Sequence, residues 1–234
     1  FLLTWFVSEK SAILLAAFSS ILWYQVGVDF LALSDLTHVW NALTRFAISL
    51  GFIYVVRAYK KERTFARQDY LTKIANKQQF TEMAMMEIER CRRYGRPFSA
   101  VYMDVDDFKK INDTLGHRAG DELLFQVAQT LRNNIRSADT VARLGGDEFA
   151  ILLPETNFEP GCKLINNIQR LLLEKMQEGG WQCTFSFGLV TFPMPPANVD
   201  ELIHCADTLM YKAKETGKNK IICTQYGLQD NREK

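Results

Sequence analysis

The chain has 234 residues, of which 47% are hydrophobic, so it can bury the core of one ordinary domain and a second, smaller unit. Its formal net charge is +1, which argues against a nucleic-acid-binding protein, because such proteins need a strongly basic surface. The five cysteines are scattered and form no CxxC pair. We therefore expect free thiols in a reducing compartment, and no zinc site.

The N-terminal part is more apolar than the rest and predicts a membrane region over residues 1–57. Ser11–Val28 carries no charge across 18 residues, and Trp40–Tyr59 is mostly apolar, although Arg45 interrupts it. A basic cluster follows, and the positive-inside rule then places everything after it in the cytoplasm. Phe1–Val7 is typical of the end of a preceding helix, so we expect a fragment of a longer protein. Buried helices of a soluble sensor domain are the alternative.

Residues 58–68 contain neither Gly nor Pro and predict a helical signalling linker that reaches Asp69 as an N-cap or joint. Beyond it, helical and strand-like patterns alternate, which predicts an α+β layered domain. The expected helices cover Lys77–Tyr94, Asp121–Ile135, and about 159–177 and 199–215. The expected strands cover Phe98–Val105, Thr140–Leu144, Phe149–Leu153, Thr184–Phe192 and Lys220–Thr224. The polar residues 225–234 predict a disordered tail.

The most informative short motif is Gly145-Gly146-Asp147-Glu148, which lies between two apolar strand-like runs. Two glycines allow a tight hairpin, and they leave no side chain to keep a phosphate away from the backbone. Adjacent carboxylates are hard oxygen ligands, suited to Mg²⁺ on a nucleotide. Taken alone, the motif is equally typical of a surface hairpin with an acidic tip.

A second acidic element supports the metal-binding interpretation. The apolar run Phe98–Met103 ends in Asp104, Asp106 and Asp107, so a predicted strand presents carboxylates at its end. Asp104 and Asp147 together predict a site for one or two Mg²⁺ ions. Two such ions are the usual apparatus of in-line phosphoryl or nucleotidyl transfer.

Four ordered motifs within residues 69–224 resemble the GGDEF family of diguanylate cyclases. They are Asp69–Thr72 with Asn76, Lys109–Asp121, Arg143–Phe149, and Ala206–Lys214 with Gly217–Asn219. The chain departs from the family where Lys73 replaces a usual Gly, where Lys77-Gln78 replaces an Arg pair, and where Lys218 and Lys220 replace arginines. The resemblance implies a palm-like α+β domain whose central sheet is mixed, mainly antiparallel and flanked by helices. Here transmembrane helices would precede that domain.

The resemblance also implies a nucleotide site. Two Mg²⁺ ions, for which Mn²⁺ can substitute, would be held by Asp104, the Val105 carbonyl and Asp147. Glu148 would be either a metal ligand or the general base for a ribose 3′-hydroxyl, and the sequence leaves both roles open. The remaining substrate contacts would come from Phe108, Lys109, Gly145, Gly146, Lys214 and Lys218.

Two further pairs resemble family sites for the base and for the product. Asn112 and Asp121 resemble guanine readers, because a carboxylate can accept both donors of the guanine edge and would repel the N1 acceptor of adenine. Arg136 and Asp139 form an RxxD motif five residues before Gly145, which resembles a product-inhibition site, with Arg170 as a candidate second arginine. The alternatives are that Asn112 lies in an ordinary turn, that Asp121 caps a helix, and that Arg136 and Asp139 form a surface ion pair.

The function that the resemblance implies is the condensation of two GTP molecules to cyclic di-GMP with release of two pyrophosphates. One domain would hold one GTP, so the enzyme would act as a homodimer through its GGDEF domain and its membrane or linker helices. We expect a multi-pass protein of the bacterial inner membrane with a cytoplasmic catalytic domain and feedback inhibition by cyclic di-GMP. The alternative is an inactive GGDEF module that binds GTP or cyclic di-GMP and signals through a partner.

Overall fold

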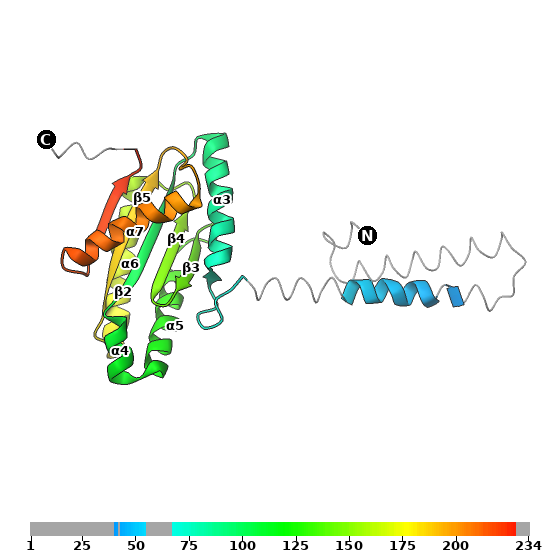
Figure 1. The fold of residues 1–234 in the computed structure, drawn as a ribbon, viewed down its shortest axis with the longest axis horizontal. Helices are drawn as coiled ribbons and strands as arrows, with labels where there is room; N and C mark the ends of the chain where they lie inside the picture. Colours follow the sequence, from blue (N-terminus) through cyan, green and yellow to red (C-terminus); the bar gives the residue numbers. More distant parts are fainter. Residues whose placement is uncertain (1–39, 42, 55–66, 228–234) are drawn as a thin grey trace, which may run out of the picture. The chain divides into compact units, whose positions relative to one another are not determined.

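The computed structural model describes residues 40–41, 43–54 and 67–227, and the chain divides into two compact units, Phe1–Ala66 and Arg67–Lys234 (Figure 1). In the first unit, residues 40–41 and 43–54 are helical. Among the described residues, no helix is both long and apolar enough to cross a bilayer. The predicted span Ser11–Val28 and most of the predicted linker lie outside the described residues, so both stay predictions.

The described part of the second unit is a six-stranded sheet with helices on both faces (Figure 1). The helices are α3 (Lys77–Tyr94), α4 (Phe108–Leu115), α5 (His117–Asn133), α6 (Phe158–Glu178) and α7 (Val199–Glu215). The strands are β1 (Ala75–Asn76), β2 (Phe98–Asp106), β3 (Thr140–Gly145), β4 (Glu148–Leu153), β5 (Thr184–Phe192) and β6 (Ile221–Gln225).

The sheet order is β1-β3-β4-β2-β5-β6. The two outer pairs, β1 with β3 and β5 with β6, are parallel, and the three inner pairs are antiparallel. This is the mixed, mainly antiparallel sheet that the sequence predicts, so the fold class of this unit is confirmed.

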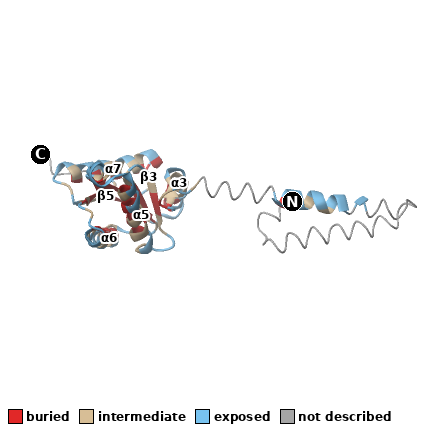
Figure 2. Ribbon diagram, turned by 90° about the horizontal axis from the view of Figure 1, so that it is seen from below, coloured by how far each residue is buried: buried red, intermediate tan, exposed pale blue. Residues whose placement is uncertain are grey.

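Alternation along β2 separates two hydrophobic cores. Met103 and Val105 belong to the core that contains the inner faces of α5 and α6, whereas Ala100 and Tyr102 belong to the core shared with α3 and α7. Figure 2 shows the buried residues gathered on the sheet and on the inner sides of the helices. Because successive side chains of a strand point to opposite faces, Asp104 follows Tyr102 on the α7 side.

The helix that follows the predicted joint, α3, begins at Lys77 as expected. Asn76 is the N-cap of α3, because its side chain accepts a hydrogen bond from the Gln79 amide at 3.0 Å. Asp69 lies in the turn before β1 and caps no helix. Of its two predicted roles, the N-cap is wrong, and the joint stays a prediction. Gly95 ends α3 in the left-handed conformation at φ 65°, and Tyr94 before it is the last helical residue, as predicted.

The C-terminal boundary also differs from the prediction. Gln225 is the last residue of β6, and the Tyr226 ring packs on Phe192 with centroids 5.0 Å apart. The Tyr226 hydroxyl also donates to Glu201 at 2.8 Å. The first residues of the predicted tail therefore belong to the domain, and residues 228–234 lie outside the described residues.

Candidate active site

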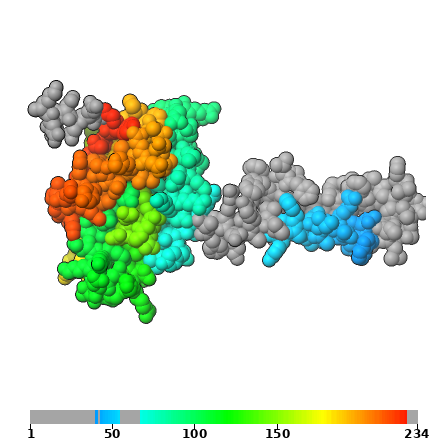
Figure 3. All heavy atoms as spheres, viewed as in Figure 1, coloured from blue at the N-terminus to red at the C-terminus, as the bar shows by residue number. Residues whose placement is uncertain are grey.

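The predicted carboxylates meet at one end of the sheet. Asp104 on β2 lies directly opposite Glu148 on β4 in the antiparallel register. The Val105 amide donates to the Asp147 carbonyl at 3.2 Å, which fixes the turn against the end of β2. In Figure 3 the lime-green hairpin of β3 and β4 reaches the surface between α7 in orange and the α4–α5 segment in green.

Asp104 is a buried carboxylate with one close cation. It is 5% exposed, and its Oδ2 lies 2.7 Å from Nζ of Lys214 on α7. Burial raises the pKa of Asp104 to about 6, and the negative charges of Asp147 and Asp106 add to this effect, which the contact with Lys214 partly offsets. The site therefore holds a carboxylate that attracts a positive charge strongly once it is ionised.

The turn itself leaves open space for a ligand. Gly146 has φ 48° and is followed by Asp147, so the positive φ stands first in a two-residue hairpin loop, as in a type II′ turn. A Cβ added at Gly145 or at Gly146 would meet no atom within 4 Å. The glycines thus keep a backbone surface free beside the carboxylates, as the sequence predicts.

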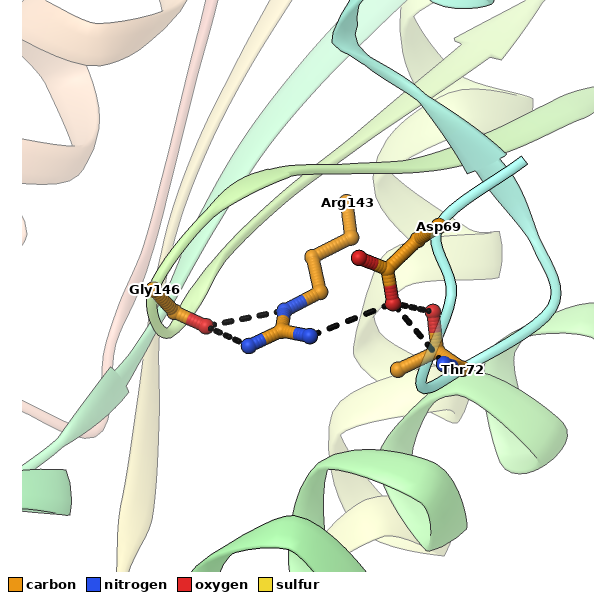
Figure 4. A network of polar contacts seen from close by, with 4 residues as sticks. All are labelled: Asp69, Thr72, Arg143 and Gly146. Atoms are coloured by element: carbon orange, nitrogen blue, oxygen red, sulfur yellow. Dashed lines mark hydrogen bonds and ion pairs between the residues drawn. The ribbon is translucent and has the colours of Figure 1, made fainter. Parts of the chain in front are cut away.

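Arg143 ties this turn to the segment that enters the domain (Figure 4). Its Nε and one terminal nitrogen donate to the Gly146 carbonyl at 2.9 and 2.7 Å, and its other terminal nitrogen lies 3.1 Å from Oδ1 of Asp69. The same Asp69 oxygen accepts from the Thr72 amide at 2.8 Å and from the Thr72 hydroxyl at 2.7 Å. Arg143 and Asp69 belong to two of the predicted motifs, but their contact was not predicted.

The predicted phosphate contacts, Phe108 and Lys109, lie at the start of α4. Phe108 and Lys109 are the first residues of this helix, and the first amides of a helix lack acceptors within it. Asp107 precedes them in the left-handed conformation, at φ 60°, and its carboxylate lies 2.8 Å from Nζ of Lys218. Lys214 and Lys218, the two lysines predicted to bind phosphate, therefore each form an ion pair with a carboxylate at this end of the sheet.

Asp106, for which no role was predicted, is a structural residue. It is 1% exposed and accepts from the Thr184 hydroxyl at 2.6 Å, the Ser186 hydroxyl at 2.8 Å and the Asn219 amide at 3.1 Å. These contacts join the end of β2 to β5 and to the turn after α7. They hold the loop that carries Lys218 close to the carboxylates.

The predicted guanine readers lie on neighbouring helices. Asn112 is on α4 and Asp121 is on α5, and a Cβ at Gly120 would lie 2.0 Å from Oδ1 of Asn112. Only glycine at position 120 allows this approach. Asp121 is exposed and lines an open depression together with Leu71, Arg118, Glu122 and Phe125.

The oxygen ligands at this end of the sheet suit a hard divalent cation. The carboxylates of Asp104, Asp147 and Glu148 and the Val105 carbonyl offer the oxygen donors that Mg²⁺ and Mn²⁺ prefer. In the part of the chain that the structure describes, however, no three His, Cys, Asp or Glu side chains are grouped so that they could hold a metal ion. The donor chemistry fits the predicted metal site, and the ligand assignment stays a prediction.

The RxxD motif forms a local turn between α5 and β3. The Arg136 amide donates to Oδ2 of Asp139 at 2.9 Å, and the Asp139 amide donates back to the Arg136 carbonyl at 3.0 Å. No ion pair joins these two described side chains, so the expected alternative of a surface salt bridge is absent. Arg170, the candidate second arginine, contacts Glu174 at 2.6 Å and Asn167 at 2.9 Å. Its role stays a prediction.

Comparison with known proteins agrees with this geometry. The family model described as "Diguanylate cyclase, GGDEF domain" matches residues 66–220. Diguanylate cyclase DosC of Escherichia coli K12 is 36% identical over 157 residues, which cover 65% of this chain and 34% of that protein. The probable diguanylate cyclase DgcT of the same organism is 30% identical over 217 residues, or 91% of this chain and 45% of DgcT. The chain spans less than half the length of each of these curated relatives.

Solved structures share the fold. The GGDEF domain of PA1120 (YfiN or TpbB) from Pseudomonas aeruginosa is 30% identical with a TM-score of 0.58, over 65% of this chain and 98% of that one. The coiled coil and GGDEF domain of DgcB from Caulobacter crescentus, in complex with c-di-GMP, gives a TM-score of 0.70 at 24% identity, over 77% of this chain and 98% of that one. The second likeness concerns the fold alone.

Proposed function

The chain belongs to the GGDEF family of diguanylate cyclase domains, and from this premise we propose that it condenses two GTP molecules into cyclic di-GMP. The observation that carries the proposal is the meeting of Asp104, Asp147 and Glu148 at one sheet end, beside the start of α4 and the lysines of the α7 end. Carboxylates for a metal and a positively charged cradle for phosphates are the two parts that nucleotidyl transfer requires.

In the proposed reaction, the 3′-hydroxyl of one GTP attacks the α-phosphate of the other. A new P–O bond forms as the bond to pyrophosphate breaks, and the attacking hydroxyl loses its proton. GGDEF diguanylate cyclases generally use divalent metal ions, which here would neutralise phosphate charge. Asp104, Asp147 and the Val105 carbonyl would hold two Mg²⁺ ions, with Mn²⁺ able to substitute. Glu148 would be a further ligand or the base that accepts the proton.

The phosphates would lie against the α4 start and the glycine turn. The amides of Phe108 and Lys109 and the ammonium groups of Lys214 and Lys218 would bind their oxygens. Asn112 and Asp121 would select guanine, since a site built to accept hydrogen bonds rejects a base that cannot donate them.

Since one domain binds one GTP, the proposed active form is a homodimer in which two such sites face each other. The proposed anchoring in the bacterial inner membrane, with a cytoplasmic catalytic domain, follows from the N-terminal sequence alone. The apolar segments on which it depends lie wholly or partly outside the described residues. Cyclic di-GMP at Arg136 and Asp139 would act as a feedback inhibitor.

The direct test is to incubate the purified protein with GTP and Mg²⁺ and to identify the product by chromatography and mass spectrometry. We expect cyclic di-GMP and two pyrophosphates for each product molecule, and no product when chelator removes the metal. ATP in place of GTP is the substrate control. Tight GTP or cyclic di-GMP binding without any turnover would reject the cyclase and support the alternative, an inactive GGDEF module that signals through a partner.

A further inference from the structure

Two lysines proposed to bind phosphate each contact a carboxylate, but the two contacts differ. Lys214 lies 2.7 Å from Asp104, whose side chain is 7% exposed, whereas Lys218 lies 2.8 Å from Asp107, whose side chain is 55% exposed. A buried carboxylate needs a compensating positive charge far more than an exposed one does. Lys214 is therefore the counter-ion of the principal predicted metal ligand.

This contact places a positive charge on a predicted metal ligand. Asp104 is opposite Glu148, and the charge of Asp147 acts on it directly, yet no three such side chains are grouped for a metal among the described residues. The ammonium group of Lys214 lies 2.7 Å from Oδ2 of Asp104. A divalent ion that binds this oxygen would compete with Lys214 for it.

We propose that Lys214 is a displaceable counter-ion, which leaves Asp104 for a nucleotide phosphate when the metal arrives, so that metal and triphosphate bind cooperatively. The inference rests on the proposed function for the identity of the ligand. Without nucleotide, the metal must break an ion pair and leave an ammonium group without a partner. When nucleotide is bound, a phosphate oxygen can pair with the ammonium group of Lys214, because the four-carbon side chain of lysine is flexible. By linkage, the triphosphate must strengthen metal binding by the same factor by which the metal strengthens triphosphate binding.

The first experiment measures Mn²⁺ binding by electron paramagnetic resonance at about pH 8.5, where carboxylates are ionised. We expect Lys214→Met to bind Mn²⁺ about tenfold more tightly than the parent in the absence of nucleotide, because no ion pair has to break. Lys212→Met is the charge-matched control. Lys212 is exposed on the same helix, and residues two apart do not share a helix face. An equal gain in both variants, or no gain in Lys214→Met, would overturn the proposal.

The second experiment adds a non-hydrolysable GTP analogue and repeats the Mn²⁺ titration. In the parent the analogue should strengthen metal binding, and in Lys214→Met this strengthening should be about tenfold smaller, because the exchange of partners is gone. Lys212→Met should show the parent's coupling. A Lys214→Met variant that keeps the full coupling would contradict the exchange. These are binding measurements, so they remain readable even if no cyclic di-GMP is ever formed.

A third measurement needs no substitution and covers the case in which Lys214→Met fails to fold. Acetic anhydride labels accessible amines, and mass spectrometry then reports the extent for each lysine. Mn²⁺ alone should increase the labelling of Lys214, and addition of the GTP analogue should decrease it again, while Lys212 stays constant. If the extent of Lys214 labelling changes with neither Mn²⁺ nor the GTP analogue, the proposal is rejected.

Discussion

Glu148 lies at the start of β4, half-buried and directly opposite Asp104. We expect Glu148→Gln to lower the rate of cyclic di-GMP formation by about two to four orders of magnitude, the usual contribution of a positioned acid–base group. The change is isosteric and lies at a turn, so the free energy of unfolding should move by no more than about 0.5 kcal/mol. Near-normal turnover, measured beside an unchanged unfolding midpoint, would remove Glu148 from the chemistry.

Asp121 is exposed at the open depression between Leu71 and Phe125, so its carboxylate is available to a base. Asp121→Ala should reduce the preference for GTP over ATP by at least tenfold while stability stays nearly constant. Inosine triphosphate, which lacks the 2-amino donor, separates the two hydrogen bonds. The neighbouring exposed Glu122→Ala is the control. Unchanged discrimination against ATP in Asp121→Ala would mean that another group reads the base.

Lys73 stands where the family usually has glycine, and the structure gives a reason for that preference. Lys73 is exposed and has φ 60°, a left-handed conformation that is unfavourable for any residue with a Cβ. Lys73→Gly should therefore raise the free energy of unfolding by roughly 1 kcal/mol, as measured in urea. Lys73→Ala keeps the Cβ and should give no comparable gain. Equal effects of the two variants would show that the side chain, and not the backbone, matters.

At the scale of helices and strands, long periodic segments were predictable and short ones were not. The predicted bounds of α3 and β5 agree with the structure. The helix α4 was not predicted, because its eight residues are mostly polar and contain a single buried one, Ile111. The start of α5 was predicted four residues late, because Gly116 at the N-cap makes no side-chain cap bond and so leaves no start signal. The two-residue β1 exists only through its pairing with β3, which no local pattern encodes.

The Asp69–Arg143 network joins the turn before β1 to β3. It also predicts that the stability of the protein depends on pH. Burial alone would raise the pKa of Asp69, but hydrogen bonds from Thr72 and the charge of Arg143 outweigh it and hold this pKa below the ordinary 3.8. A lowered pKa in the folded state means that ionised Asp69 stabilises the protein above about pH 4, and that this contribution is lost as the pH falls through the folded-state value.

Asp69→Asn should accordingly lower the free energy of unfolding by about 1–3 kcal/mol at pH 7, and the difference from the parent should shrink below about pH 3. Glu89→Gln, which removes an exposed helix ion pair with Arg92, is the control and should change stability by less than about 0.5 kcal/mol. Urea titrations at both pH values measure the effect. A difference that is the same at pH 3 and pH 7 would contradict the electrostatic origin.

For the molecule as a whole, the RxxD turn and the Gly-Gly turn lie at opposite ends of β3, roughly 17–20 Å apart along the strand. A ligand at Arg136 would therefore not overlap the active site. If cyclic di-GMP binds there, Arg136→Ala should raise its inhibition constant about ten- to a hundredfold and leave uninhibited turnover intact, because charge-assisted phosphate contacts are lost.

Arg132→Ala, an exposed arginine on the last turn of α5, is the matched control and should leave inhibition unchanged. Initial rates at several GTP and cyclic di-GMP concentrations give the inhibition constant and the type of inhibition. Inhibition of Arg136→Ala that is as tight as in the parent and competitive with GTP would restrict the motif to a structural turn.

The parts of the candidate site that sequence could predict are those with a local pattern. The acids at the end of β2 and the Gly-Gly turn converge as expected, because a motif of a few residues predicts each of them. Asp106 and Arg143 received no role, because their partners lie far along the chain: Thr184 and Ser186 in one case and Asp69 in the other. The contacts of Lys214 and Lys218 with carboxylates could likewise not be predicted from the sequence, because they depend on how α7 packs across the sheet.

The sheet order also has a mechanical consequence. The chain enters the domain at the edge strand β1, which pairs with β3 through two residues, whereas the C-terminal edge strand β6 pairs with β5 through five. A pull on the entering segment therefore loads the shortest seam of the sheet, the two-residue pairing of β1 with β3. Through Asp69 and Arg143 that seam is joined to the Gly-Gly turn. Force applied at β1 would therefore reach the turn that carries the carboxylates, whereas force applied at β6 would be distributed over its longer pairing with β5.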